Sequence, residues 1–153
     1  MAFKLSGRSL GKLEGVHPVL VDTVKRAIEV SSVDFGVIYG VRSLAEQKRL
    51  YEAKRSQTMK SKHLVQEDGY SHAVDLMAYD GSDPSWEMAM YDDIADAMKA
   101  AAKEKGAKIR WGAAWTVDNI AEWGGTMQEA MNDYIDIRRK SGRTPFILSL
   151  IHI

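Results

Sequence analysis

Two imidazoles and a carboxylate lie within one short polar stretch of the sequence. His63 follows a Ser-Lys pair, and His72 stands three residues before Asp75. Neutral imidazole nitrogens and carboxylate oxygens are ligands of catalytic Zn²⁺ sites, which keep one coordination position open for water. Asp75 lies in the apolar segment 73–79, and a carboxylate on a buried strand is costly unless a cation pairs with it. The stretch therefore suggests a metal site.

A polar loop separates His63 from the strand expected to carry Asp75. Its residues 67–69, Glu-Asp-Gly, favour a turn that lets His63 fold back toward Asp75. A His-containing loop before a strand is also typical of a solvated turn, in which His63 and Asp75 share no more than a hydrogen bond. Spacing alone leaves both interpretations open.

Length and composition exclude several classes of protein. The chain has 153 residues, the size of one domain, with 21 basic residues balancing 21 acidic ones. It has no cysteine, so a metal site must use His and carboxylate ligands. No apolar run resembles a signal peptide or a membrane span. We expect one domain over residues 1–153, a monomer, with no nucleic acid or membrane partner.

The remaining patterns predict an α+β fold, with a small antiparallel sheet flanked by helices and the metal site on the exposed face of the sheet. Residues 1–16 are expected to form an arm, and His17 and Ser43 to precede or cap helices. The predicted helices are 18–30, 44–53, 86–105 and 126–139; the predicted strands are 34–41, 73–79 and 108–112; residues 80–85 are predicted to be a turn.

The polar stretch also resembles a known signature. Ser61-Lys62-His63, a loop and Ala73-Val74-Asp75-Leu76 resemble the Ser-x-His…Gly-x-Ala-x-Asp motif of the zinc peptidoglycan peptidases. That family includes VanY- and VanX-like D-alanyl-D-alanine carboxypeptidases and phage L-alanyl-D-glutamate endolysins. The resemblance implies that His63 and Asp75 are zinc ligands and that the cofactor is Zn²⁺.

The identity of the imidazole ligand stays open between His63 and His72. The loop is longer than the family usually has, and Ser71 stands where the family usually has Gly. His63 is favoured because it follows the Ser-Lys pair. His72 would point to the opposite face of a strand from Ser71 and Ala73.

A second segment resembles the same family and supplies a candidate catalytic arginine. Residues 40–43, Gly-Val-Arg-Ser, with Gln47 and the Leu-Tyr pair at 50–51, are similar to the family's Gly-Tyr-Arg-Ser…Gln…Leu-Tyr segment. The resemblance implies that Arg42 faces the active site, where a guanidinium can hold a substrate carboxylate or stabilise an oxyanion. Gln47 is expected to support Arg42 or to contact the peptide.

Two further segments suggest where the substrate binds. Residues 110–115, Arg-Trp-Gly-Ala-Ala-Trp, resemble the family's Arg-Trp-Gly-Gly-x-Trp. This resemblance assigns Trp115 to the substrate cleft, whereas Trp111 fits either the cleft or the core. Ser61, in the Ser-Lys-His segment, is also expected to contact substrate. The basic segment 54–62 reads either as a solvated loop or as a groove edge facing the anionic cell-wall polymer.

The C-terminal tail departs from the family pattern. The family supplies its third ligand and a general base in a strand of the type Phe-Ile-Asp-Gly-Pro-His-Phe-Glu, and residues 145–147 match its entrance. Leu148 and Ile151 then stand where the Asp and His are expected. His152, one place further on, is the candidate third ligand, and Ser149 precedes it by three residues. Residues 148–153 are therefore interpreted as an atypical or foreign tail.

The resemblance implies a zinc-dependent peptidase that cleaves peptidoglycan stem peptides, most closely a phage endolysin of the L-alanyl-D-glutamate type. Such an enzyme would stay in the host cytoplasm until it is released to the cell wall. Zinc would activate a water molecule, a carboxylate would take its proton, and Arg42 would steady the substrate. Because the expected C-terminal ligand and base are missing, we expect this chain to bind zinc weakly. The alternative function is a catalytically dead module that binds the cell wall.

Overall fold

One antiparallel sheet organises the chain. The computed structural model describes residues 3–56, 59–145, 147–148 and 150–152, without the side chains of Leu150 and His152. The strands run in the order β1-β2-β5-β4, with β3 paired to β2. The strands are β1 (Asp34–Tyr39), β2 (Ala73–Asp80), β3 (Asp83–Ser85), β4 (Arg110–Trp111) and β5 (Leu150–His152); the helices are α1 (Gly7–Lys12), α2 (Pro18–Val30), α3 (Leu44–Glu52), α4 (Met88–Lys105), α5 (Met127–Lys140) and the 3₁₀ turn η1 (Ile120–Glu122).

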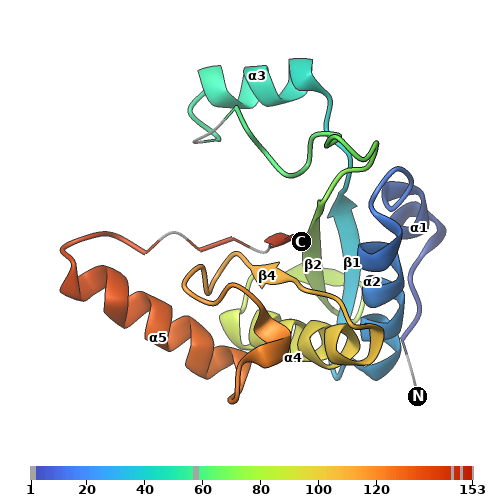
Figure 1. Ribbon diagram of the computed structural model, residues 1–153. Coiled ribbons are helices and arrows are strands. Elements are labelled where there is room, and N and C mark those ends of the chain that lie inside the picture. The colour runs from blue at the N-terminus through green and yellow to red at the C-terminus, as the bar shows by residue number, and fades with distance from the viewer. Residues whose placement is uncertain (1–2, 57–58, 146, 149, 153) are drawn as a thin grey trace.

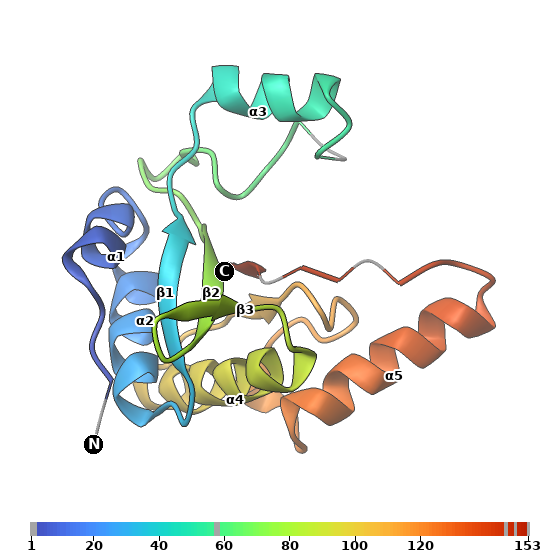
Figure 2. The ribbon, with the colours of Figure 1, turned by 180° about the vertical axis from the view of Figure 1, so that it is seen from behind.

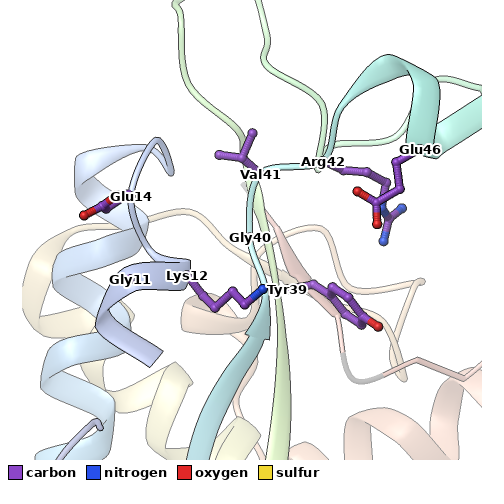
Figure 3. A pocket seen from close by; sticks show the side chains of 8 residues that line it. All are labelled: Gly11, Lys12, Glu14, Tyr39, Gly40, Val41, Arg42 and Glu46. Atoms are coloured by element: carbon purple, nitrogen blue, oxygen red, sulfur yellow. The ribbon is translucent and has the colours of Figure 1, made fainter. Parts of the chain in front are cut away.

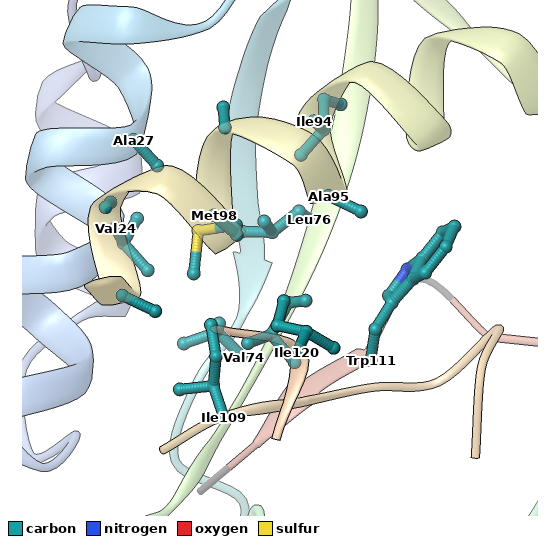
Figure 4. Packing of buried hydrophobic residues seen from close by; sticks show 14 of the residues in the cluster. Val24, Ala27, Val74, Leu76, Ile94, Ala95, Met98, Ile109, Trp111 and Ile120 are labelled. Atoms are coloured by element: carbon teal, nitrogen blue, oxygen red, sulfur yellow. The ribbon is translucent and has the colours of Figure 1, made fainter. Parts of the chain in front are cut away.

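The two faces of β2 have different environments. Val74, Leu76 and Ala78 belong to the hydrophobic core, together with residues of α2 and α4 (Figure 4). Because side chains alternate along a strand, Asp75 lies on the other face. The α+β prediction is confirmed, and the helices α2 and α4 lie together against one side of the sheet (Figure 1). The helix α3 stands apart, beyond the ends of β1 and β2, in both views (Figures 1 and 2).

The ends of the first long helices follow local capping chemistry. The His17 side chain accepts a hydrogen bond from the amide of Val19, and Pro18 occupies the first turn of α2. The Ser43 hydroxyl accepts a hydrogen bond from the amide of Glu46 at the start of α3. Both capping predictions are confirmed. Over the described residues, no helix combines the length and apolar character that crossing a membrane requires.

The prediction of an arm over residues 1–16 is wrong, because residues 7–12 form α1. The Ser9 hydroxyl accepts a hydrogen bond from the amide of Val37, at 3.0 Å. The helix thus covers the outer edge of β1, whose amides would otherwise lack partners. The sequence does not predict this helix, because the segment contains two glycines and is mostly polar. A hydrogen bond to a residue 28 positions away stabilises it instead.

The prediction of a turn over residues 80–85 is also corrected. Asp83–Ser85 forms the short strand β3, which folds back on β2 with Ala78 opposite Ser85. Pro84 is tolerated because a proline at a sheet edge leaves no ladder donor missing. The turn itself is confined to residues 81–82, where Gly81 has a positive φ of 63°.

A buried carboxyl in α4 opposes folding at neutral pH. Asp92 is 5% exposed, and its Oδ1 has no hydrogen-bond partner among the described residues. Burial raises the pKa of Asp92 from 3.8 to about 6, and the nearby carboxylates of Asp96 and Asp93 add to the increase. The folded protein therefore holds this proton more tightly than the unfolded chain does. Protonated Asp92 therefore contributes to the free energy of unfolding. This contribution is complete below the pKa that Asp92 has in the unfolded chain, and it is lost as the pH rises through about 6.

Replacing Asp92 by Asn is therefore expected to stabilise the protein at neutral pH. We expect the free energy of unfolding near pH 7.5 to rise by about 1 kcal/mol. We also expect its decline between about pH 4 and pH 6.5 to flatten. Urea denaturation at several pH values measures both effects. Asp133→Asn, at an exposed position of α5, is the control and should change the unfolding curve little. Equal stability of D92N and wild type at all pH values would contradict the prediction.

Candidate active site

The structure brings the His63 and Asp75 side chains together. The Nε2 atom of His63 lies 3.4 Å from Oδ2 of Asp75. His63 is buried, with 4% of its surface exposed, whereas the Asp75 side chain is 21% exposed. The loop between them turns at Gly69, which has a positive φ of 85°. One end of this pair therefore remains open to solvent.

The orientation of the His63 ring is fixed by the main chain of Gly40. The His63 Nδ1–H donates a hydrogen bond to the carbonyl oxygen of Gly40, at 2.7 Å. This bond leaves Nε2 facing a carboxylate oxygen of Asp75, either with a free lone pair or with a proton that it donates. Two acceptor atoms at this distance repel each other unless a proton or a cation lies between them. A carbonyl-anchored imidazole beside a carboxylate is also the arrangement that metal-binding histidines adopt, so both residues fit a divalent cation.

Gly40 itself is constrained by α1. A Cβ atom at this position would lie 2.0 Å from the carbonyl oxygen of Lys12, a backbone atom that has no free rotation to escape. The amide of Arg42 in turn donates to the carbonyl oxygen of His63, at 2.9 Å. The end of β1 is therefore tied both to α1 and to the loop that carries His63.

His72 belongs to a different cluster. Its Nε2 lies 2.7 Å from Oδ2 of Asp68, and the Nε2 of His17 approaches the same oxygen at 3.7 Å. The rings of His17 and His72 meet edge to face, with centroids 5.3 Å apart. Of the two imidazoles that the sequence left open, His63 is the one placed beside Asp75.

The guanidinium of Arg42 is held by a buried amide. Arg42 Nη1 donates to Oε1 of Gln47 at 2.7 Å, and Gln47 Nε2 donates to the hydroxyl of Ser56 at 2.8 Å. The Gln47 side chain has no exposed surface, so it supports Arg42 and does not face the solvent. Ser56 fixes which end of the amide points to Arg42. This interaction was not expected from the sequence, because a serine nine residues away carries no motif.

Of the two residues predicted to contact substrate, Ser61 lies in the loop of His63, whereas Trp115 lies beside Arg110. The Ser61 hydroxyl accepts a hydrogen bond from the amide of His63, at 3.1 Å, and so shapes the loop that carries the imidazole. Trp115 is partly exposed, and the Arg110 guanidinium lies 5.7 Å from its ring centroid. Trp111 is 2% exposed and belongs to the core.

The tail contributes a strand beside Asp75. In β5, the backbone of Leu150 pairs opposite Asp75, Ile151 opposite Val74 and His152 opposite Ala73. Ile151, the position where the family's His is expected, is buried in the core. The side chain of His152 lies outside the described part of the structure. Phe146 and Ser149 are also outside it. Within the described residues, no group of three His, Asp or Glu side chains could hold a metal ion.

Two hollows lie where β1 ends and α3 begins, and they share the wall formed by Tyr39, Arg42 and Glu46. The smaller, of about 180 Å³, also has Lys12 and Gly40 in its lining, and Figure 3 shows its residues. The larger, of about 520 Å³, extends along α3. Tyr39 stands opposite Asp75 in the β1–β2 register, so both hollows have one lining residue that neighbours Asp75 on the sheet.

Comparison with known proteins shows the family to which the chain belongs. Residues 1–134 match the family of phage L-alanyl-D-glutamate peptidases. The chain is 30% identical over 119 residues to the L-alanyl-D-glutamate peptidase of Escherichia phage T5, an alignment that covers 75% of this chain and 83% of that one. It is 38% identical to the L-Ala D-Glu endopeptidase ChiX of Serratia marcescens, whose crystal structure matches with a TM-score of 0.67 over 77% of this chain and 86% of that one.

The fold and these relatives define the protein as a peptidase. The chain belongs to the phage L-alanyl-D-glutamate peptidase family. The resemblance seen in its motifs and the predicted peptidase activity are both confirmed.

Proposed function

We propose that this chain is a zinc-dependent endolysin that hydrolyses the bond between L-alanine and D-glutamate in peptidoglycan stem peptides. The observation that carries the proposal is the approach of His63 Nε2 to within 3.4 Å of Asp75 Oδ2, with the other ring nitrogen anchored on Gly40. Both relatives are named for peptidase activity on this dipeptide unit. Neither these relatives nor the described residues favour the alternative of a catalytically dead wall-binding module.

His63 and Asp75 would hold the zinc ion. When bound, Zn²⁺ polarises the scissile carbonyl and lowers the pKa of a coordinated water molecule. The Gly40 carbonyl keeps the proton of His63 on Nδ1, so that Nε2 is available as a ligand without any rearrangement. Because the imidazole is buried and the Asp75 carboxylate is partly exposed, substrate reaches the pair from the Asp75 side.

Arg42 would bind the oxygen on which negative charge develops. The hydrogen bond to Gln47 occupies one of its nitrogens and leaves the rest of the guanidinium for substrate. Because the supporting amide is buried and is itself held by Ser56, the guanidinium needs little reorganisation during the reaction.

A third protein ligand would come from β5. We propose His152 for this role, since its backbone pairs with Ala73, two residues from Asp75 on β2. The enzyme would remain in the host cytoplasm until membrane damage releases it to the wall.

Position 150 offers a direct test of this geometry. Cβ atoms of directly opposite residues in an antiparallel pair lie about 5 Å apart, and residue 150 stands opposite Asp75. Leu150→His should therefore raise the zinc affinity about tenfold or more. Competition with a chromophoric chelator measures the change. Leu148→His, at a described residue outside the paired part of β5, is the control. An unchanged affinity in a folded L150H protein would contradict this placement of β5.

The proposed activity is tested on purified peptidoglycan. Hydrolysis should release fragments that begin with D-glutamate, which mass spectrometry identifies after labelling of new amino groups. Removal of metal with a chelator should stop the reaction, and added Zn²⁺ should restore it. Fragments that begin with any other residue would refute the proposed bond specificity.

A further inference from the structure

The larger hollow carries more positive charge than the proposed reaction needs. It is lined by Tyr39, Arg42, Glu46, Arg49, Leu50, Ala53 and Arg55. Three guanidinium groups thus face one carboxylate, so the hollow attracts anions. Arg42 is already assigned to the reacting carbonyl, which leaves Arg49 and Arg55 without a role.

Arg49 and Arg55 are available for a ligand. Both side chains are exposed, and within the described residues neither lies within 4 Å of an acidic group. Arg49 projects from α3, and Arg55 follows its C-terminal end. The dipole of α3 favours cations near its C-terminus, but it does not explain why Arg49 and Arg55 line the same hollow.

The turn that carries Arg55 is rigidly built. Lys54 adopts a left-handed conformation with φ 59°, the only described non-glycine residue with a positive φ. The amides of Arg55 and Ser56 both donate to the carbonyl of Leu50, at 2.8 and 3.1 Å. The Ser56 hydroxyl is bound to Gln47, which also holds Arg42. One set of hydrogen bonds therefore positions both Arg42 and the backbone that carries Arg55.

The proposed substrate has an anionic group suited to this hollow. A D-glutamate residue within a peptide uses one of its two carboxyl groups in the chain. The other remains a free carboxylate on the glutamate side of the scissile bond. Guanidinium groups bind carboxylates through paired, charge-assisted hydrogen bonds.

We infer that Arg49 and Arg55 form a subsite that binds the free carboxylate of D-glutamate and thereby distinguishes it from the corresponding carboxamide. This inference rests on the proposed function, which supplies the substrate. Tyr39, which stands opposite Asp75 in the β1–β2 register, lines the larger hollow, so a peptide that continues from Asp75 into this hollow would extend along α3 toward the two arginines. Glu46 at the shared wall opposes an anion near Arg42 and favours its placement further along the hollow.

Two peptides that differ only in this group test the inference. Each contains the L-alanyl-D-glutamate unit followed by a diamino acid, with the glutamate carried either as free carboxylate or as carboxamide. We expect the wild-type protein to bind the carboxylate form about tenfold more tightly and to show the difference in KM. Arg49→Gln with Arg55→Gln should bring the ratio of the two KM values close to one. Lys48→Gln, an exposed cation of α3 outside the lining, is the control.

The possible outcomes separate the subsite from the reaction. Cleavage of both peptides with equal KM by the wild-type protein overturns the subsite and leaves the proposed function intact. A preference that survives in the double variant also overturns it. Carboxylate-dependent binding that is lost in the double variant, without cleavage of either peptide, supports the subsite and refutes the reaction. Absence of both binding and cleavage refutes the two together.

Discussion

The His63→Ala variant is expected to lose stoichiometric zinc and to hydrolyse peptidoglycan more than about 100-fold more slowly than the wild-type enzyme. The physical reason is that His63 would supply the buried nitrogen ligand of the proposed zinc site, so its loss leaves only Asp75 and the proposed third ligand His152. Asp75→Asn should behave similarly, because an amide oxygen lacks the charge that neutralises the cation. Metal analysis of the purified proteins and turnover of cell walls measure the two effects.

His72 supplies the matched control for this prediction. It is an imidazole in the same loop, but its Nε2 is bound to Asp68, not to Asp75. His72→Ala should therefore keep its zinc content and most of its activity. Zinc loss in H72A with retention in H63A would reverse the assignment of the ligand. Circular dichroism should show that all variants remain folded before the metal contents are compared.

Arg42→Gln is expected to lower kcat by about 100-fold, the effect of removing one donor to a developing oxyanion. KM should change much less, because the hydrogen bonds of Arg42 strengthen as charge develops on the carbonyl. Arg42→Lys should recover only part of the rate, since an ammonium cannot reproduce the planar fork that Gln47 positions.

A second variant tests the support of Arg42 separately from its charge. Ser56→Ala removes the hydroxyl that accepts from Gln47 and allows the buried amide to rotate. We expect a fall of kcat smaller than that of R42Q, with unchanged zinc content. If R42Q lowered zinc content as much as His63→Ala, Arg42 would act on the folding of the metal site and not on the reaction.

The sequence predicts most of the elements because their signals are local. The apolar run around Asp75, the apolar period of α2 and the caps at His17 and Ser43 involve neighbouring residues, and the structure reproduces each. Helix α1 and strand β3 were missed because they depend on partners elsewhere. The first is held by Val37, and the second pairs with the far end of β2.

The candidate site also contains residues that local motifs predict and residues that only the folded structure reveals. His63, Asp75 and Arg42 are found from motifs, since their chemistry resides in their own side chains. The roles of Gly40 and Ser56 could not be found this way. Gly40 acts through its carbonyl oxygen, and Ser56 acts through an amide that only the folded chain brings close. The tail stays the least predictable part, because its sequence departs from the family pattern before the expected ligand.

The main-chain anchor of His63 determines how the enzyme tolerates random mutation. A carbonyl oxygen cannot be deleted by exchanging a side chain, so no codon change at position 40 removes this acceptor directly. The vulnerability lies instead in the space around Gly40, where even alanine would collide with the Lys12 carbonyl. In a library of random variants, position 40 should therefore be as intolerant as His63 and Asp75, the proposed ligands, although Gly40 itself is not one of them.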